Sequence, residues 1–121
     1  MIRGIGIDII KIDRINEDHI KKILSAKEKE IYEGFKGTKR KREYAAGRFA
    51  AKEAITKCFK RFIPYSEITI LNGKNGDPYV EESSLKYIFS KFGGDGEIYI
   101  TLSHERDYAV AAAIVIDKVD K

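Results

Sequence analysis

The chain alternates between two hydrophobic patterns, one with a period of two residues and one with a helical period. Residues 2–12 are β-branched and interrupted by glycine, which predicts a strand. Its two faces differ: one carries Ile5, Ile7 and Ile9, and the other carries Gly4, Gly6, Asp8 and Ile10. Alternation over residues 98–103 predicts another strand. Residues 108–116 are apolar on both faces, which predicts a central strand covered on both sides.

The rest of the chain has mostly helical signals. Helices are expected over residues 14–24, 25–34, 41–59 and 83–92, and short strands at 68–71 and 79–81. Asp13 is placed to cap the first helix. Ser25 and Glu28 have the spacing of a capping box at the start of the second. Ser83 or Ser84 is expected to cap the fourth.

These elements predict an α+β fold: a small, mostly antiparallel sheet with one long helix and several short helices packed on it. The 121 residues fit a single domain, spanning residues 1–121. With 43% hydrophobic and 35% charged residues, the composition is that of a globular protein. The net charge of +4 favours an acidic partner or phosphates without choosing between them.

The number of cysteines and the length of the apolar runs narrow the class of protein further. The single cysteine, Cys58, excludes a disulfide framework and multi-cysteine zinc sites, and it falls on an apolar helix stripe. The longest apolar run, residues 108–116, is about half of the ~18 residues that a membrane span needs. Asp8 interrupts the first apolar segment, so no signal-peptide core is expected. We therefore expect a cytoplasmic protein with no membrane partner.

Asp8 is the first candidate for chemistry, because it places a carboxylate in an apolar strand. Gly4 and Gly6 on the same face leave room for something to approach the backbone. A carboxylate in such a place must be neutralised, be paired or bind a cation. The alternative is a charge that faces water from an edge strand.

The helix around residues 48–57 is the second candidate. A helical wheel places an apolar stripe on one side and Glu53 and Lys57 on the other. The spacing of Glu53 and Lys57 is also that of an ordinary exposed ion pair. Arg48 lies beside the apolar stripe, where its guanidinium either extends to water or binds an anion, and spacing alone favours the first.

The third candidate is the polar segment of residues 103–108, which is expected to form a turn between two strands and contains His104. A lone histidine in a turn is usually solvated. The basic run of residues 36–42 lacks aromatic residues for base stacking, so no nucleic-acid partner is expected. Zinc, Walker-type and dinucleotide motifs are absent from the sequence.

Three separated segments match one family: residues 4–9 (GIGIDI), 47–54 (GRFAAKEA) and 102–109 (LSHERDYA). With the chain length, they strongly resemble the holo-acyl-carrier-protein synthases, the short bacterial phosphopantetheinyl transferases. The resemblance implies magnesium-dependent transfer of 4′-phosphopantetheine from coenzyme A to a serine of apo-acyl carrier protein, with release of adenosine 3′,5′-bisphosphate. It also implies a homotrimer with active sites in the clefts between subunits.

The resemblance implies catalytic roles for three residues. Asp8 and Glu53 match the family's magnesium carboxylates, and magnesium favours one or two carboxylates completed by water and substrate phosphates. Glu53 is also the nearest candidate to orient or deprotonate the carrier serine. Lys57, one turn further along the helix, would hold the phosphates.

Coenzyme A contacts are implied for Arg48, near its 3′-phosphate, and for Ser103 and His104, near its nucleotide; whether His104 contacts phosphate or acts as a base stays open. Two positions depart from the family pattern. Residues 60–64 replace a glycine-bearing turn, and Asp77 stands where a basic residue is common.

The resemblance also implies a carrier protein with an acidic recognition helix, so contacts with it are expected from Arg14, Lys21 and Lys22. Ordinary surface charge is the alternative, since Glu17 and Asp18 share that segment. For the whole chain, the alternative function is a non-catalytic basic module that binds RNA or an acidic protein. A purely structural oligomer would leave Asp8 unexplained.

Overall fold

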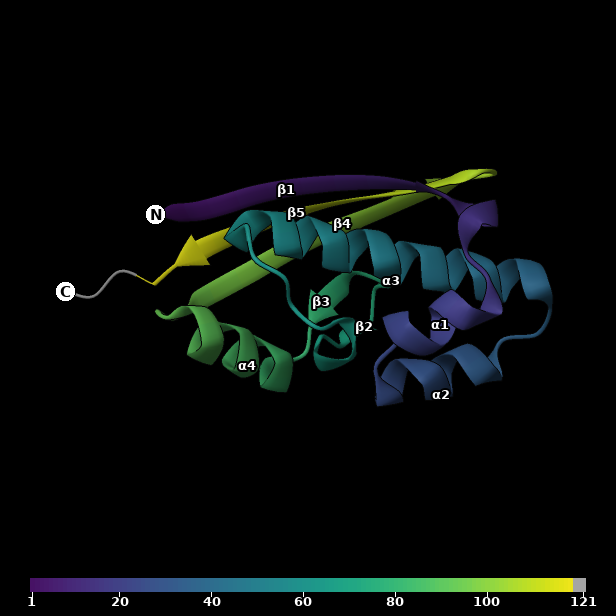
Figure 1. Cartoon of the computed structure of the whole chain (residues 1–121), viewed down its shortest axis with the longest axis horizontal. Coiled ribbons are helices and arrows are strands. Elements are labelled where there is room, and N and C mark those ends of the chain that lie inside the picture. The colour runs from purple at the N-terminus through teal and green to yellow at the C-terminus, as the bar shows by residue number, and fades with distance from the viewer. Residues whose placement is uncertain (119–121) are drawn as a thin grey trace.

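The computed structural model describes residues 1–118 and has two layers, a sheet and a set of helices on one of its faces (Figure 1). The sheet is antiparallel with the order β1-β5-β4, formed by Ile2–Lys11, Tyr108–Asp117 and Gly96–Glu105. The 22-residue helix α3, Thr38–Phe59, runs along the sheet. This arrangement confirms the predicted α+β fold and the central position of β5.

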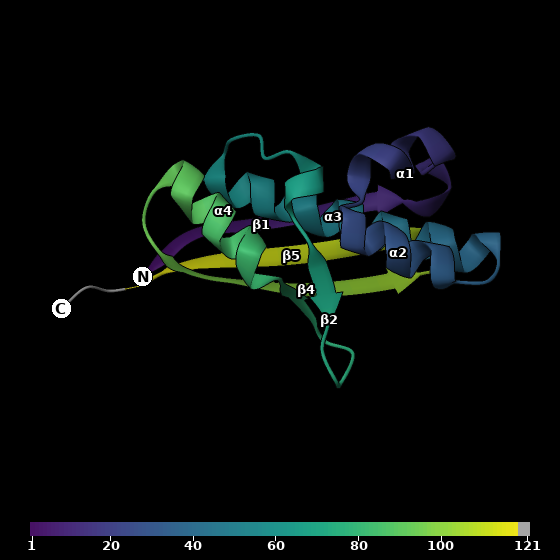
Figure 2. The same ribbon diagram turned by 90° about the horizontal axis from the view of Figure 1, so that it is seen from below.

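The shorter elements lie on the same side of the sheet as α3 (Figure 1). They are η1 (Ile12–Arg14), α1 (Glu17–Ile23), α2 (Ala26–Gly34), η2 (Tyr65–Glu67), β2 (Ile70–Asn72), β3 (Pro78–Val80) and α4 (Glu82–Phe92). The hairpin of β2 and β3 carries a loop that projects from the body of the molecule (Figure 2). No helix within residues 1–118 is both long and apolar enough to cross a membrane.

Glycines let α3 approach β1 unusually closely. A Cβ atom on Gly6 would lie 1.9 Å from the carbonyl oxygen of Ala54, and one on Gly4 would lie 2.3 Å from that of Cys58. The room predicted above this face of β1 is therefore filled by the chain's own helix. Because the contact is so close, Asp8, the next residue on this face, lies beside α3.

The main core lies between α3 and the sheet. Small residues of α3 form a buried cluster with β5, made of Ala51, Ala54, Ile55, Cys58, Ala111, Ala113 and Val115. As predicted, the Cys58 thiol is buried. The thiol donates to the carbonyl of Ala113 at 3.4 Å, and burial raises its pKa to about 11.

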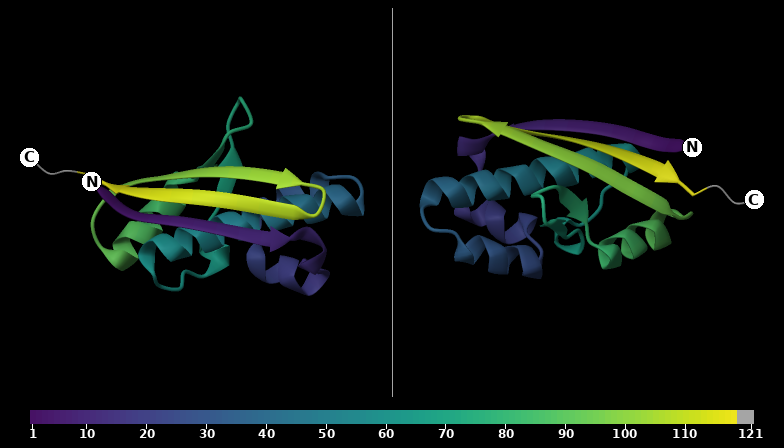
Figure 3. Two further views of the ribbon diagram at one scale, coloured as in Figure 1. Left: turned by 90° about the horizontal axis from the view of Figure 1, so that it is seen from above. Right: turned by 180° about the vertical axis from the view of Figure 1, so that it is seen from behind.

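The opposite face of the sheet is uncovered, as Figure 3 shows from above. Ile5, Ile7 and Ile9 of β1 are 63–66% exposed, and Ile114 of β5 is 37% exposed. The prediction that β5 is covered on both sides is therefore wrong for a single chain. The described part of the chain has no element to cover this face.

A fully buried ion pair joins the helices to the hairpin. The Lys52 ammonium donates to Glu28 Oε1 at 2.5 Å and to the carbonyls of Ile23 at 2.7 Å and Tyr65 at 2.9 Å. Glu28 Oε2 accepts from the backbone N–H of Ile70 at 2.9 Å. These bonds satisfy both charges, which burial would otherwise make costly.

The helix starts show which of the predicted caps are confirmed and which are wrong. The Ser25–Glu28 capping box is confirmed. Asp13 is not a cap: Ile12 and Ile15, three residues apart, are both buried, so this segment forms a 3-10 turn and α1 begins later, capped by Asn16. Ser83 and Ser84 lie inside α4, whose N-cap is Glu81. Residues 39–42 of the basic run lie at the start of α3, and Lys36 precedes this helix.

Candidate active site

Asp8 and Glu53 line the same pocket, which has a volume of about 420 Å³. We call it the carboxylate pocket; its other lining residues are Ile9, Ile10, Arg14, Ile15, His19, Lys22, Ile23, Phe49 and Tyr65. Asp8 comes from the helix-facing side of β1 and Glu53 from α3. The fold thus brings together two carboxylates that are far apart in the sequence.

Lys57 neutralises Asp8. Its ammonium lies 3.1 Å from Asp8 Oδ1 and donates to the carbonyl of Ile7 at 2.9 Å. The exposed ion pair expected between Glu53 and Lys57 is not among the ion pairs of residues 1–118, because Lys57 turns toward β1 instead. The water-facing interpretation of Asp8 is also wrong, since only 17% of its side chain is exposed although β1 is an edge strand.

Tyr65 holds the second carboxylate. Its hydroxyl donates to Glu53 Oε1 at 2.6 Å. Burial, followed by the hydrogen bond to Glu53 and the charges of Glu53 and Asp8, raises the pKa of Tyr65 well above its ordinary value of 10.0. The phenol therefore stays protonated and acts as a donor at neutral pH. Nothing in the hydrophobic pattern singles out Tyr65, and the sequence analysis missed it.

The donor set fits magnesium and not a closed zinc site. No group of three or more histidine, cysteine or acidic side chains within residues 1–118 is arranged to hold a metal ion. Two carboxylates in an open pocket instead match a cation that keeps several waters and takes its remaining ligands from substrate phosphates. Asp8 and Glu53 are the residues that would hold such an ion.

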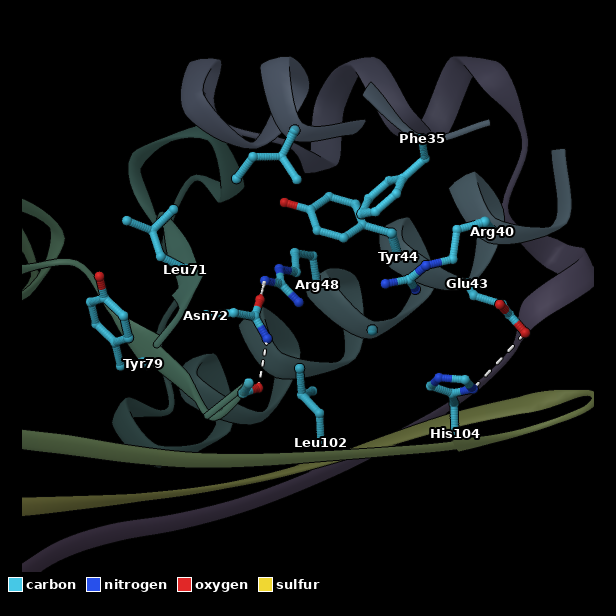
Figure 4. Close-up of a pocket in the computed structure, with 13 residues that line it drawn as sticks. Phe35, Arg40, Glu43, Tyr44, Arg48, Leu71, Asn72, Tyr79, Leu102 and His104 are labelled. Atoms are coloured by element: carbon cyan, nitrogen blue, oxygen red, sulfur yellow. Dashed lines mark hydrogen bonds and ion pairs between the residues drawn. The ribbon is translucent and has the colours of Figure 1, made fainter. Parts of the chain in front are cut away.

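A second pocket, of about 680 Å³, lies between α3, the β2–β3 hairpin and β4 (Figure 4). We call it the basic pocket, because Arg40, Arg48 and His104 line it. Aromatic and aliphatic side chains, among them Phe35 and Tyr79, form much of the remaining wall. Cations beside aromatic rings suit a phosphorylated nucleotide.

Arg48 does not extend to water, contrary to the interpretation that its spacing favoured. It is 5% exposed, and its guanidinium lies 4.4 Å from the ring centre of Tyr44. It donates to the carbonyl of Ile70 at 3.2 Å and to the side chain of Asn72. These partners belong to β2, which the helical wheel of α3 cannot reveal.

His104 belongs to β4, not to the turn that follows it. Its Nδ1 lies 4.0 Å from Glu43 Oε2 at the edge of the basic pocket (Figure 4). Ser103 alternates with it, so Ser103 is on the uncovered face of the sheet and does not line the basic pocket. Its proposed contact with coenzyme A stays a prediction.

The two pockets share no lining residue, although α3 contributes to both. Arg48 and His104 are brought together in one, and Asp8 and Glu53 in the other. Of the three basic residues expected to contact a carrier protein, Arg14 and Lys22 line the carboxylate pocket, and Lys21 is exposed on α1. His19, which is exposed on α1, also lines this pocket.

Comparisons with known proteins show the family of the chain. Residues 4–113 match the family described as the 4′-phosphopantetheinyl transferase superfamily. A holo-[acyl-carrier-protein] synthase of Petrotoga mobilis is 67% identical over 118 residues, which cover 98% of this chain and 99% of the relative. A synthase of the same name from Geobacillus sp. is 40% identical, with 95% of this chain and 97% of the relative covered.

A solved structure has the same fold. The crystal structure of a holo-(acyl-carrier-protein) synthase from Bacillus anthracis, in complex with CoA (3′,5′-ADP), superposes with a TM-score of 0.82 at 30% identity and covers 98% of this chain and 99% of that one. The chain therefore belongs to the 4′-phosphopantetheinyl transferase superfamily and, within it, to the holo-[acyl-carrier-protein] synthases. It is an enzyme, so the alternative of a non-catalytic binding module is wrong.

Proposed function

We propose that this enzyme transfers 4′-phosphopantetheine from coenzyme A to a serine of apo-acyl carrier protein, depends on Mg²⁺ and releases adenosine 3′,5′-bisphosphate. The observation that carries the proposal is the convergence of Asp8 and Glu53 on one open pocket. The names of the relatives, and the coenzyme A complex of the Bacillus anthracis structure, support the choice of substrates.

In the proposed reaction the serine Oγ forms a bond to the β-phosphorus as the bond from that phosphorus to the bridging oxygen breaks. The bridging oxygen leaves with the nucleotide. Asp8 and Glu53 would hold the magnesium ion, which would supply positive charge to offset the charge that develops on the phosphates. Glu53, which lines this pocket, is proposed to orient the serine hydroxyl or to accept its proton. Lys57 can turn from Asp8 to the phosphates, since its side chain is 54% exposed.

The basic pocket is the proposed site for the nucleotide of coenzyme A. Arg40 and His104 present cationic or hydrogen-bonding groups to it, and Tyr79 and Phe35 offer apolar walls. Arg48 already donates to β2, so in addition to a 3′-phosphate contact it holds the hairpin that forms one wall.

We further propose a homotrimer whose active sites combine the carboxylate pocket of one subunit with the basic pocket of its neighbour. Two features of one chain support this. Its two candidate half-sites are separate. Its uncovered sheet face carries Ile5, Ile7, Ile9 and Ile114, an apolar surface suited to contact with further copies of the chain.

The carrier protein is proposed to dock at the rim of the carboxylate pocket. Arg14 of η1 and Lys22 of α1 line this pocket, and Lys21 precedes Lys22 on α1, so positive charge lies beside the two carboxylates. Such contacts would speed association with an acidic partner, and added salt would weaken them.

The test is to incubate the enzyme with coenzyme A, apo-acyl carrier protein and Mg²⁺ and to weigh the carrier by mass spectrometry. We expect a phosphopantetheine adduct and loss of the reaction on addition of a chelator. D8N and E53Q should each lower the rate by about 100-fold or more, whereas E82Q, at an exposed glutamate of α4, should not. An active control synthase that modifies the same carrier, beside no adduct here, would refute the proposal.

A further inference from the structure

Tyr65 is held at both ends by two consecutive residues of α3. Its carbonyl oxygen accepts from Lys52 at 2.9 Å, and its hydroxyl donates to Glu53 at 2.6 Å. The ring lies between those of Phe49 and Phe62, at centroid distances of 5.7 and 6.0 Å. The phenol is thus fixed by its backbone, its ring and its hydroxyl.

The backbone anchor is rigid because it belongs to the buried network. The Lys52 ammonium is fully buried and also binds Glu28 and the carbonyl of Ile23. Within η2 the carbonyl of Tyr65 also accepts from the N–H of Ile68 at 3.1 Å. The position of the hydroxyl is therefore set by the core of the molecule rather than by the rotamer of a surface side chain.

A hydrogen-bond donor in a fixed position restricts the conformations of the Glu53 side chain. A glutamate on a helix has three rotatable bonds, and on an open pocket wall it would sample several rotamers. The donor at Oε1 restricts that freedom, and Glu53 lines the pocket that Asp8 also lines. Groups that hydrogen-bond a metal ligand orient it and strengthen metal binding.

We propose that Tyr65 is a positioning residue that holds the Glu53 carboxylate ready for a divalent cation. The inference rests on the proposed function, in which Glu53 and Asp8 bind that cation. Sequence pattern gave no sign of it, because the hydroxyl reaches Glu53 only after the chain has turned back from the end of α3, where Lys60 takes a left-handed conformation with φ of 57°.

The test is Y65F, which removes the hydroxyl and keeps the ring between Phe49 and Phe62. Mn²⁺ serves as a probe, since its preference for oxygen ligands resembles that of Mg²⁺. Binding of Mn²⁺ to the free enzyme, followed by electron paramagnetic resonance, should weaken by roughly 10- to 100-fold. The Mg²⁺ concentration for half-maximal transfer should rise in parallel, and saturating Mg²⁺ should restore most of kcat.

Y87F is the matched control, because it removes a phenol hydroxyl from α4, away from both pockets. It should bind Mn²⁺ as the wild type does. If Y65F binds Mn²⁺ normally and is only less stable to denaturant, Tyr65 is a structural tie and the inference is wrong. If the wild type itself performs no transfer, the proposed function has failed instead, so the two failures are distinguishable.

Discussion

Cys58 couples the stability of the fold to alkaline pH. Burial raises the pKa of its thiol from 9.0 to about 11. Between these values the unfolded chain loses the proton and the folded chain keeps it, so the folded state binds more protons. The free energy of unfolding should therefore fall as pH rises from about 9 to about 11. Below pH 9 the thiol is protonated in both states and does not change the free energy of unfolding with pH.

The measurement is urea unfolding at pH 8 and at pH 10.5 for the wild type and for C58A. Other groups titrate in this range, so the informative quantity is the difference between the two proteins. C58A should lose less stability than the wild type between the two pH values. Equal losses would show that the thiol is not responsible.

At the scale of single residues, the sequence predicts what depends on neighbours in the same segment. Asp8 could be singled out because its strand is apolar and glycine-flanked. The partners of Lys57 and Arg48 come from β1 and β2, which no helical wheel of α3 contains. The role of Tyr65 depends on the path of residues 60–64, for which the sequence has no periodic signal.

At the scale of elements, the contact between β1 and α3 determines whether the two carboxylates meet. G6A would place a Cβ atom 1.9 Å from the carbonyl oxygen of Ala54, so helix and strand must separate. We expect a loss of at least about 1–3 kcal/mol in the free energy of unfolding, as for other overpacked sites. Chemical denaturation measures it.

Gly47, within α3, provides a control variant whose expected effect on stability is opposite to that of G6A. A Cβ atom there meets nothing within 4 Å. G47A should stabilise the helix by about 0.5–1 kcal/mol, because alanine loses less backbone entropy on folding than glycine does. A G6A protein as stable as the wild type would mean that the close contact is not required.

The buried pair of Lys52 and Glu28 connects α3 with α2, and its removal should show in stability. K52M leaves the Glu28 carboxylate buried without its cation, which should cost about 3–5 kcal/mol. E28Q added to K52M removes that charge and should recover part of the loss. Denaturation of the two single variants and the double variant completes the cycle; additive losses would contradict coupling between the side chains.

Element boundaries were predictable to the extent that their signals were local. The capping box at Ser25 and Glu28 depends on residues three apart and was predicted from them. The start of α1 depends on the burial of Ile12 and Ile15 against the rest of the protein, so Asp13 was a misleading local signal. Likewise local sequence favours Ser83 or Ser84 as a cap, whereas the hydroxyl of Ser84 accepts from the N–H of Thr69 across the core.

For the whole molecule, the hydrophobic pattern correctly predicted that β5 is the central strand, but it did not reveal that the chain covers only one face of the sheet. Residues 108–116 are apolar on both faces, and the chain itself covers only one of them. A second apolar face left open in one chain is expected when further copies cover it. I7D would place a charge on this face, where Ile7 is 63% exposed, and should shift the protein to monomers in light scattering after size exclusion.

The separation of the two pockets gives a prediction that depends on the assembly rather than on any one chain. In the proposed trimer, E53Q disables the carboxylate pocket and H104A disables the basic pocket, so each variant alone should have little activity. In a mixed trimer, some sites combine Glu53 from one chain with His104 from the other. Random mixing makes about one quarter of the sites intact, because each half is sound in about half of the chains.

Co-expression of the two variants with different affinity tags, followed by purification on both tags, isolates the mixed assemblies. Each trimer that contains both variants has one intact site among its three, so the transfer rate of the purified mixed assemblies should clearly exceed that of either parent, up to about one third of the wild-type rate. A double variant that carries E53Q and H104A on the same chain, mixed with itself, supplies the background. If the mixed assemblies are no more active than the parents, both pockets act within one subunit, and the open sheet face must have another role.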